Sequence, residues 1–317
     1  MHDRGWGDMR PLQRPYLPAD LFRDAEKQGL EKSVHLQANW DLADPVGETR
    51  WVEKISANGF PHGIVGFVDF SSPDAQRVLE GHAEASKRLR GIRQVLNRHA
   101  DPVRNRAPKD YLADETWVEN IGLLRRFGWS FDVQVYYQQM PAIAALARRY
   151  PDIQFILDHT GMPAERDAAG IEGWEKGMQL LAQCPNIAVK ICGLGMVDYS
   201  WTVDSIRPFV LQSIDWFGPQ RAMFASNFPV DRLMSSYDAL SRRYDVLAPY
   251  GQAQLFDSVN LPPGSDPAHP LGTDQIGRDI LTRLIYGAQN TVGIAMVTTV
   301  LAFLLGASLG FLAATVG

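Results

Sequence analysis

Short apolar segments alternate with amphipathic segments over residues 1–246, and this alternation limits the possible folds more than any other feature. Seven segments read as strands: residues 33–38, 62–70, 89–96, 130–136, 154–159, 187–193 and 222–227. Helical periodicity covers residues 19–28, 75–86, 116–127, 141–150, 171–183, 205–217 and 235–246. Strands that alternate with helices in this way form parallel βα units. We therefore predict an α/β fold, an incomplete TIM-type (β/α)8 barrel with seven recognisable strands, because a closed barrel has one strand more.

Polar residues stand where several of these strands end. Asp158 and His159 follow the short strand QFIL, residues 154–157, and precede a turn at Thr160 and Gly161. Asn227 and Asp231 follow the last predicted strand in the same manner. Parallel barrels keep their active sites at the carboxyl ends of the strands. We therefore expect the chemistry of this chain at that end of the sheet.

The composition narrows the class of partner. The chain is 45% hydrophobic and 21% charged, with a formal net charge of −5. Without a concentration of basic residues there is no electrostatic basis for nucleic-acid binding, so a small-molecule substrate is expected. The two cysteines, Cys184 and Cys192, fit neither a disulfide framework nor a zinc spacing. Cys192 falls within a predicted strand and is expected in the core.

Six segments carry a resemblance to a known family: RPYLPADL, SVHLQANWD, RGIRQVLN, LDHTGMP, VKICGLG and FASNFPVDR. Their order and spacing make residues 15–246 similar to the amidohydrolase-related (β/α)8 hydrolases, in the branch that contains L-fuconolactonase and 2-pyrone-4,6-dicarboxylate lactonase. The resemblance implies hydrolysis of a cyclic ester. Two features depart from the family pattern. No strand ending in His-x-His is found, and Asn227 stands where the family's last strand carries a carboxylate.

The candidate catalytic residues are His159, Asn227, Asp231 and Lys190. The resemblance implies that His159 polarises the substrate or binds a metal, and that Asn227 lines the site. Asp231 could supply a carboxylate from the following loop. Lys190 lies within a predicted strand, and because an unpaired buried ammonium is costly, it is expected either to be paired or to belong to the site.

The candidate substrate-binding residues are Arg93, Tyr136 and His35. The resemblance implies that Arg93 holds a carboxylate or lactone oxygen, a task suited to a guanidinium, while an ion pair at the barrel mouth is the alternative. Tyr136 and His35 lie near strand ends, and each fits packing as well as a pocket. Asp158 is expected to point away from His159, since side chains alternate along a strand, which favours a structural role.

Few metal ligands are in reach of this site. With no His-x-His strand and no carboxylate at Asn227, one imidazole and one amide are too few good ligands for zinc. We therefore expect no metal cofactor, or a weakly bound divalent metal at His159.

The sequence changes character near residue 247. The segment HPLGTDQIGRD resembles the inner-membrane permease of dipeptide and oligopeptide ABC transporters. Residues 292–316 carry no charge and are long enough to span a bilayer. We therefore predict two domains, 1–246 and 247–317, joined by an irregular linker. Arg278 and Arg283 precede the apolar span, and the positive-inside rule then places the barrel in the cytoplasm and the tail in the inner membrane.

Three hypotheses for the whole chain remain open at this point. The first is a lactonase-like hydrolase, lacking the family's first strand and attached to the membrane by its tail. The second is a fragment of a transport permease in which the barrel is incidental. The third is an inactive product of gene rearrangement. The substrate and the oligomeric state are not fixed by the sequence.

Overall fold

The computed structural model describes residues 8–28, 30, 32–56, 59–241 and 299. The backbone divides into two units, Met1–Val259 and Asn260–Gly317, and the account below concerns the first. Within the described residues, no helix has both the length and the hydropathy needed to cross a membrane. Apart from Thr299, the predicted span at 292–316 lies outside these residues, as does the predicted boundary at residue 247.

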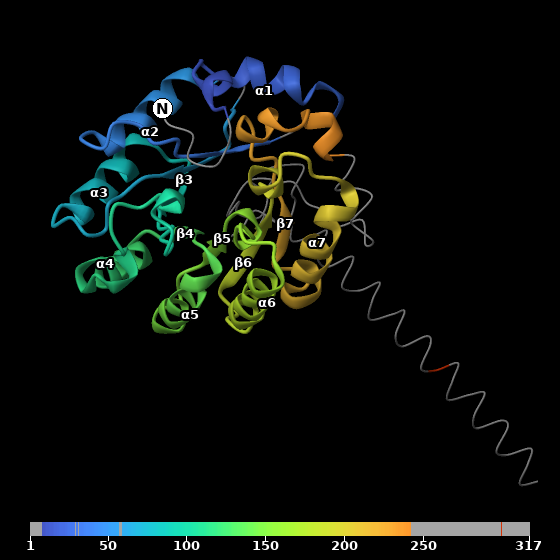
Figure 1. The fold of residues 1–317 in the computed structure, drawn as a ribbon. Coiled ribbons are helices and arrows are strands. Elements are labelled where there is room, and N and C mark those ends of the chain that lie inside the picture. The colour runs from blue at the N-terminus through green and yellow to red at the C-terminus, as the bar shows by residue number, and fades with distance from the viewer. Residues whose placement is uncertain (1–7, 29, 31, 57–58, 242–298, 300–317) are drawn as a thin grey trace, which may run out of the picture. The chain divides into compact units, whose positions relative to one another are not determined.

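Seven parallel strands form one sheet and follow the order of the chain, so each strand pairs with its neighbours in sequence. Figure 1 shows helices arranged in an arc outside these strands. The parallel α/β prediction is confirmed, as a TIM-like half-barrel in which no pairing joins the first and last strands of the described sheet. The strands are β1 (Val34–Leu36), β2 (Gly63–Gly66), β3 (Leu89–Val95), β4 (Ser130–Gln134), β5 (Phe155–Leu157), β6 (Ile187–Ile191) and β7 (Ala222–Phe224).

Most helices begin at a polar cap that the sequence supplies. Asp44, Asp114, Asp167 and Thr202 each accept a hydrogen bond from a backbone N–H in the first turn, which satisfies donors that have no partner within the helix. The helices are α1 (Pro18–Asp24), α2 (Pro45–Ile55), α3 (Ala75–Ala85), α4 (Glu115–Asn120), α5 (Met140–Arg149), α6 (Ala168–Ala182) and α7 (Val203–Phe217).

Two helical features differ from the prediction. Helix α2 was not predicted, although Asp44 caps it and Pro45 occupies its first turn, a combination typical of a helix start. The helix predicted at 116–127 is divided into α4 and a 3-10 segment, η5 (Ile121–Arg126). Each strand also ends one to four residues earlier than predicted.

The two faces of the sheet have different chemistry. Phe131 of β4 packs edge to face against Trp117 of α4, so the helix-covered face is apolar. Asp132 therefore points to the opposite face, and the pairing register places Arg93 of β3 directly beside it. Lys190 of β6 lies on that same face, because Ile156 pairs with both Asp132 and Ala188 and side chains alternate along each strand.

The N-terminal region contacts the segment that follows β7. Gln28 Nε2 donates to Asp238 Oδ1 at 2.6 Å, and Arg232 lies 3.4 Å from a carboxylate oxygen of Asp24. Figure 1 shows α1 beside this segment. Side chains, not strand pairing, thus connect the beginning and the end of the described sheet.

A group of buried side chains at the carboxyl ends of the strands

Four charged side chains meet on the inner face of the sheet. Lys190, which is 4% exposed, forms ion pairs with Asp132 and, at 3.0 Å, with Asp158. Arg93 lies 3.7 Å from the other carboxylate oxygen of Asp158. Lys190 is thus paired, which is one of the two outcomes expected for it. We call Arg93, Asp132, Asp158 and Lys190 the ionic cluster.

Burial and charge compete within the ionic cluster. Burial favours the neutral form of Asp158, but the charges of Lys190 and Arg93 outweigh it and lower the pKa of that carboxyl. Burial likewise disfavours the charged form of Lys190, but its two carboxylate partners raise its pKa. For Asp132 burial prevails, and its pKa lies above the ordinary range. Lys190 therefore stays charged at neutral pH.

His159 lies beside this cluster, in the turn η7 (His159–Gly161). Its ring is 7% exposed, and Nδ1 lies 3.4 Å from Sγ of Cys192 at the end of β6. Burial lowers the pKa of His159 to about 4, so the imidazole is neutral at pH 7. His159 and Thr160 both have a φ of 55°, in the left-handed region that is uncommon for residues other than glycine.

This turn corrects the expectation for Asp158. Alternation along a strand predicted that Asp158 and His159 point to opposite faces, with Asp158 away from the site. Asp158 instead lies in the ionic cluster, and the left-handed backbone at His159 keeps the imidazole beside it. Strand alternation does not apply at His159, because β5 ends at Leu157.

Asp231 and Asn227 form a second polar pair, after β7. Asn227 Nδ2 donates to Asp231 Oδ1 at 2.7 Å, and the backbone N–H of Gly193 also donates to this carboxyl. Asp231 is 3% exposed, and burial raises its pKa to about 7 against the effect of both hydrogen bonds. The carboxyl is therefore close to half ionised at neutral pH.

Gly193 connects the two groups. A Cβ atom on Gly193 would lie only 2.7 Å from His159 Nδ1, while its N–H binds Asp231. The residue also has a φ of 66°, which favours glycine. The imidazole and the carboxyl therefore border the same residue, which follows β6.

The structure does not bring Tyr136 and His35 into this group. Tyr136 packs in a small apolar cluster with Met162 and Met196, and its hydroxyl donates to the carbonyl oxygen of Arg104 at 2.9 Å. Nε2 of His35 lies 2.8 Å from a carboxylate oxygen of Glu48 in α2. His35 thus contacts the helix layer.

Several buried polar atoms at this end of the sheet have no hydrogen-bond partner among the described residues. They belong to three strands and the residues that follow them: Gln37 Nε2, Arg93 Nε, Asn97 Oδ1 and Asp132 Oδ2. Because buried polar groups are usually paired, these donors and acceptors suit a polar ligand. The sequence analysis did not select Asp132 or Asn97, although an acid inside the apolar strand SFDVQ is an available signal.

The described residues do not fit a zinc centre. No three histidine, cysteine, aspartate or glutamate side chains among them are grouped so that they could hold a metal ion. Nδ1 of His159 faces Cys192, and Asp158 faces Lys190 and Arg93. Structural and catalytic zinc sites use at least three such ligands, and the described residues do not supply them.

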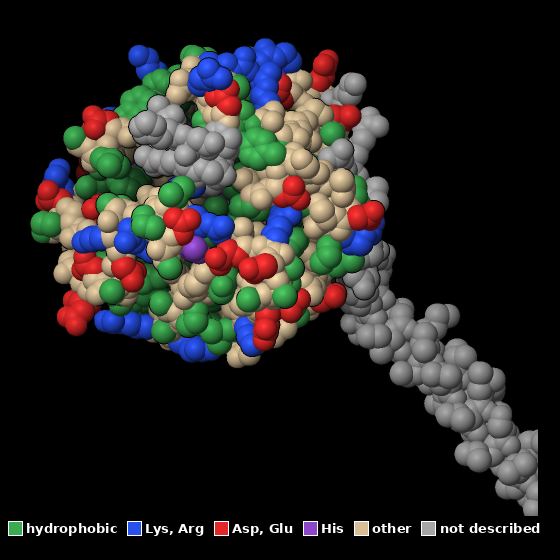
Figure 2. Space-filling model, in the orientation of Figure 1, with side chains coloured by type: hydrophobic (Ala, Val, Ile, Leu, Met, Phe, Trp, Pro, Cys, Tyr) green, Lys and Arg blue, Asp and Glu red, His purple; other side chains and the backbone are tan. Residues whose placement is uncertain are grey.

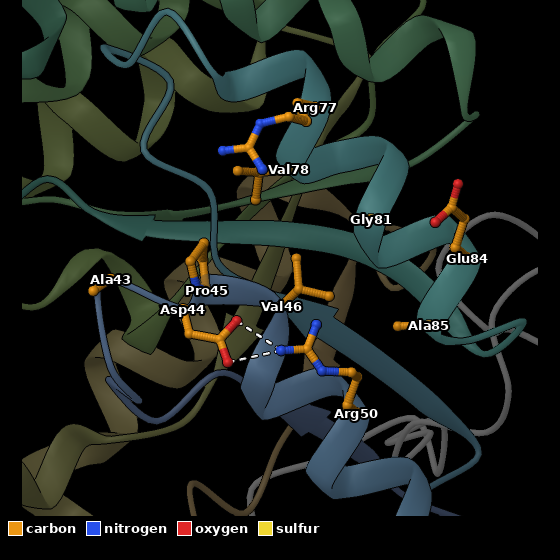
Figure 3. Close-up of a pocket in the computed structure, with 10 residues that line it drawn as sticks. All are labelled: Ala43, Asp44, Pro45, Val46, Arg50, Arg77, Val78, Gly81, Glu84 and Ala85. Atoms are coloured by element: carbon orange, nitrogen blue, oxygen red, sulfur yellow. Dashed lines mark hydrogen bonds and ion pairs between the residues drawn. The ribbon is translucent and has the colours of Figure 1, made fainter.

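A surface cavity of about 400 Å³ lies elsewhere, between α2 and α3. Figure 3 shows that its polar lining includes Arg50, which pairs with Asp44 at 2.7 Å. Both partners are about half exposed, and ion pairs of this kind are worth little. Figure 2 shows acidic and basic side chains intermingled on the face in view. We therefore place the candidate site at the strand ends, not in this crevice.

Comparison with known proteins agrees with this fold. The amidohydrolase family model matches residues 4–258. The uncharacterized protein y4mH of Sinorhizobium fredii is 46% identical over 242 residues, which cover 74% of this chain and 79% of that protein. An L-fucono-1,5-lactonase of Burkholderia ambifaria is 30% identical over 234 residues, or 71% of this chain and 74% of the lactonase. A zinc-bound amidohydrolase structure from Burkholderia multivorans has a TM-score of 0.66 and 27% identity, and the match covers 78% of this chain and 87% of that one.

A shorter similarity concerns transport. The dipeptide transport system permease protein DppC of Haemophilus influenzae is 40% identical over 81 residues, which are 23% of this chain and 28% of the permease. The match is too short to assign a transport function. The predicted joining of two protein fragments and the predicted membrane tail stay predictions. Membrane fractionation of the full chain can test the membrane tail.

Proposed function

The chain belongs to the amidohydrolase family, and we propose that it hydrolyses a lactone, with His159 polarising the carbonyl and Asp231 activating the water. The observation that carries this proposal is that both groups border Gly193 at the carboxyl ends of the strands. The similarity to the L-fucono-1,5-lactonase of Burkholderia ambifaria supports a lactone as the substrate class.

Neutral histidine suits the polarising role. Attack of water on a lactone places negative charge on the carbonyl oxygen, and a fixed hydrogen-bond donor stabilises that charge in the transition state. The buried His159 ring stays neutral because its pKa is lowered to about 4. It can therefore donate a hydrogen bond throughout the neutral range while remaining uncharged.

Asp231 suits the role of general base. A base works best when its pKa is near the working pH, and burial raises the pKa of Asp231 to about 7. Asn227 cannot accept a proton at neutral pH, but its amide donates to Asp231 and fixes the orientation of that carboxyl. We infer that the loop after β7 supplies the base and that Asn227 positions it.

The ionic cluster suits substrate binding. Arg93 Nε and Asp132 Oδ2 are buried without hydrogen-bond partners among the described residues, so they suit the oxygen atoms and hydroxyl groups of a polar lactone. Lys190 pairs with both carboxylates of the cluster. In this proposal its part in catalysis is to hold the cluster in place, and no metal takes part.

A lactone-hydrolysis assay tests the proposal directly. With L-fucono-1,5-lactone as the first substrate, we expect His159→Ala to lower kcat/KM by roughly a hundredfold, the effect of losing one electrostatic contributor. His62→Ala is the matched control, because His62 stands just before β2, at the amino end of the sheet. If the wild-type protein hydrolyses the lactone and His159→Ala does so at the same rate, His159 has no part in the mechanism.

The pH dependence tests the base. Because Asp231 must be ionised to accept a proton and its pKa is about 7, kcat/KM should rise as the pH increases through about 7. His159 should add no change there, since its pKa of about 4 lies well below. Initial rates measured from pH 5 to 9, corrected for spontaneous hydrolysis, show the rise, and a flat profile would contradict the role of Asp231.

A further inference from the structure

We propose that Cys192 fixes the tautomer of His159 by donating its thiol hydrogen to Nδ1, which leaves the ring proton on Nε2. The inference rests on one part of the proposed function, namely that His159 donates a hydrogen bond to the substrate. Cys192 is then a positioning residue that acts through His159.

The two side chains are held together by the ends of two neighbouring strands. Cys192 Sγ lies 3.4 Å from His159 Nδ1, and both residues are buried. The hydroxyl of Thr160 donates to the carbonyl oxygen of Cys192 at 3.4 Å. The backbone carbonyl oxygen of Thr160 in turn accepts a hydrogen bond from Trp174 Nε1 at 2.8 Å. These bonds connect the β5 turn to the end of β6 and to α6, so the sulfur and the imidazole have little freedom to separate.

The hydrogen bond can run in two directions, and the surroundings favour the thiol as donor. Burial raises the pKa of the Cys192 thiol, and the negative charges of Asp158 and Asp231 act in the same direction, so the sulfur keeps its hydrogen. The backbone N–H of His159 already donates to that sulfur. Sulfur is a weak acceptor, whereas an unprotonated imidazole nitrogen is a good one.

The opposite tautomer, with the proton on Nδ1 of His159, would form weaker hydrogen bonds with both Cys192 and the substrate. A proton on Nδ1 would face a sulfur that accepts weakly and already has a donor, while the good acceptor Nε2 would have no partner among the described residues. It would also present a lone pair to the carbonyl oxygen of a bound lactone. With the proton on Nε2, the same ring stabilises the negative oxygen that forms when water attacks.

Nitrogen-15 NMR of the full chain, labelled at histidine, reads the tautomer without an activity assay. Protonated and unprotonated ring nitrogens of a neutral imidazole resonate in separate regions, and His159→Gln identifies the signals of His159. We expect the wild-type proton on Nε2. Cys192→Ala should shift the tautomer equilibrium toward Nδ1 by about fivefold, the usual net worth of one hydrogen bond. Cys192→Ser keeps a donor of similar size and should preserve the wild-type spectrum.

The same variants connect the tautomer to the rate. Cys192→Ala should lower kcat for lactone hydrolysis measurably, by at most about fivefold, with little change in KM, and Cys192→Ser should restore it. A wild-type spectrum with the proton on Nδ1 overturns the inference whether or not a variant folds, and so does an unchanged spectrum in Cys192→Ala. A tautomer that shifts as expected without any change in kcat would uphold the inference and contradict the proposed catalytic role of His159.

Discussion

Asp231→Asn should lower kcat/KM for lactone hydrolysis by about a thousandfold, because general base catalysis contributes on the order of 10² to 10⁴ in rate. The substitution keeps the shape of the side chain and an oxygen that can accept the hydrogen bond from Asn227. It removes the feature that the base needs, a carboxyl whose pKa is about 7. The rise of activity with pH should disappear together with the rate.

The matched control for this variant is Asp215→Asn, an exposed position on α7. Its kcat/KM should equal that of the wild type, which separates loss of the base from a general effect of removing a negative charge. Thermal unfolding of both variants checks that they fold. An Asp231→Asn protein that is folded and retains wild-type activity would mean that the water is activated by another group.

Lys190→Met should destabilise the fold by about 3–5 kcal/mol, the usual cost of breaking a buried ion pair from one side. Methionine fills a similar volume, so the effect comes from charge and not from a cavity. Without Lys190, the one nearby cation that the described residues leave to the carboxylates of Asp132 and Asp158 is Arg93, at 3.7 Å from Asp158. The loss should shrink as the pH falls, because protonation removes the charges that Lys190 neutralises.

Urea denaturation at several pH values measures this effect. Lys176→Met is the matched control, since its pair with Glu172 on α6 is exposed and should change the free energy of unfolding by less than about 1 kcal/mol. Combining Lys190→Met with Asp132→Asn should recover part of the lost stability, because one buried charge is removed with its partner. Equal stability of Lys190→Met and wild type at neutral pH would show that the ionic cluster is not needed for folding.

Local sequence patterns predicted the strands and most helices, whereas the contacts between the site residues depend on tertiary geometry. The alternation of apolar strands and amphipathic helices is a local signal, so all seven strands were found, whereas α2, which begins after the cap at Asp44, was not predicted. The pairing of Lys190 with Asp132 depends on the register of β4 and β6, which periodicity does not reveal. The sequence pattern also did not reveal which face of the sheet His35 lies on, because its contact with Glu48 of α2 sets that orientation.

The strand order has a consequence for how the fold assembles. Each described strand pairs only with its neighbour in sequence, so the sheet can grow one βα unit at a time without closing a long loop. The contacts of Gln28 with Asp238 and of Asp24 with Arg232 join distant parts of the chain. Their loop-closure entropy is the largest in the described unit, so we expect them to form last, after the strands have brought His159 and Asp231 together.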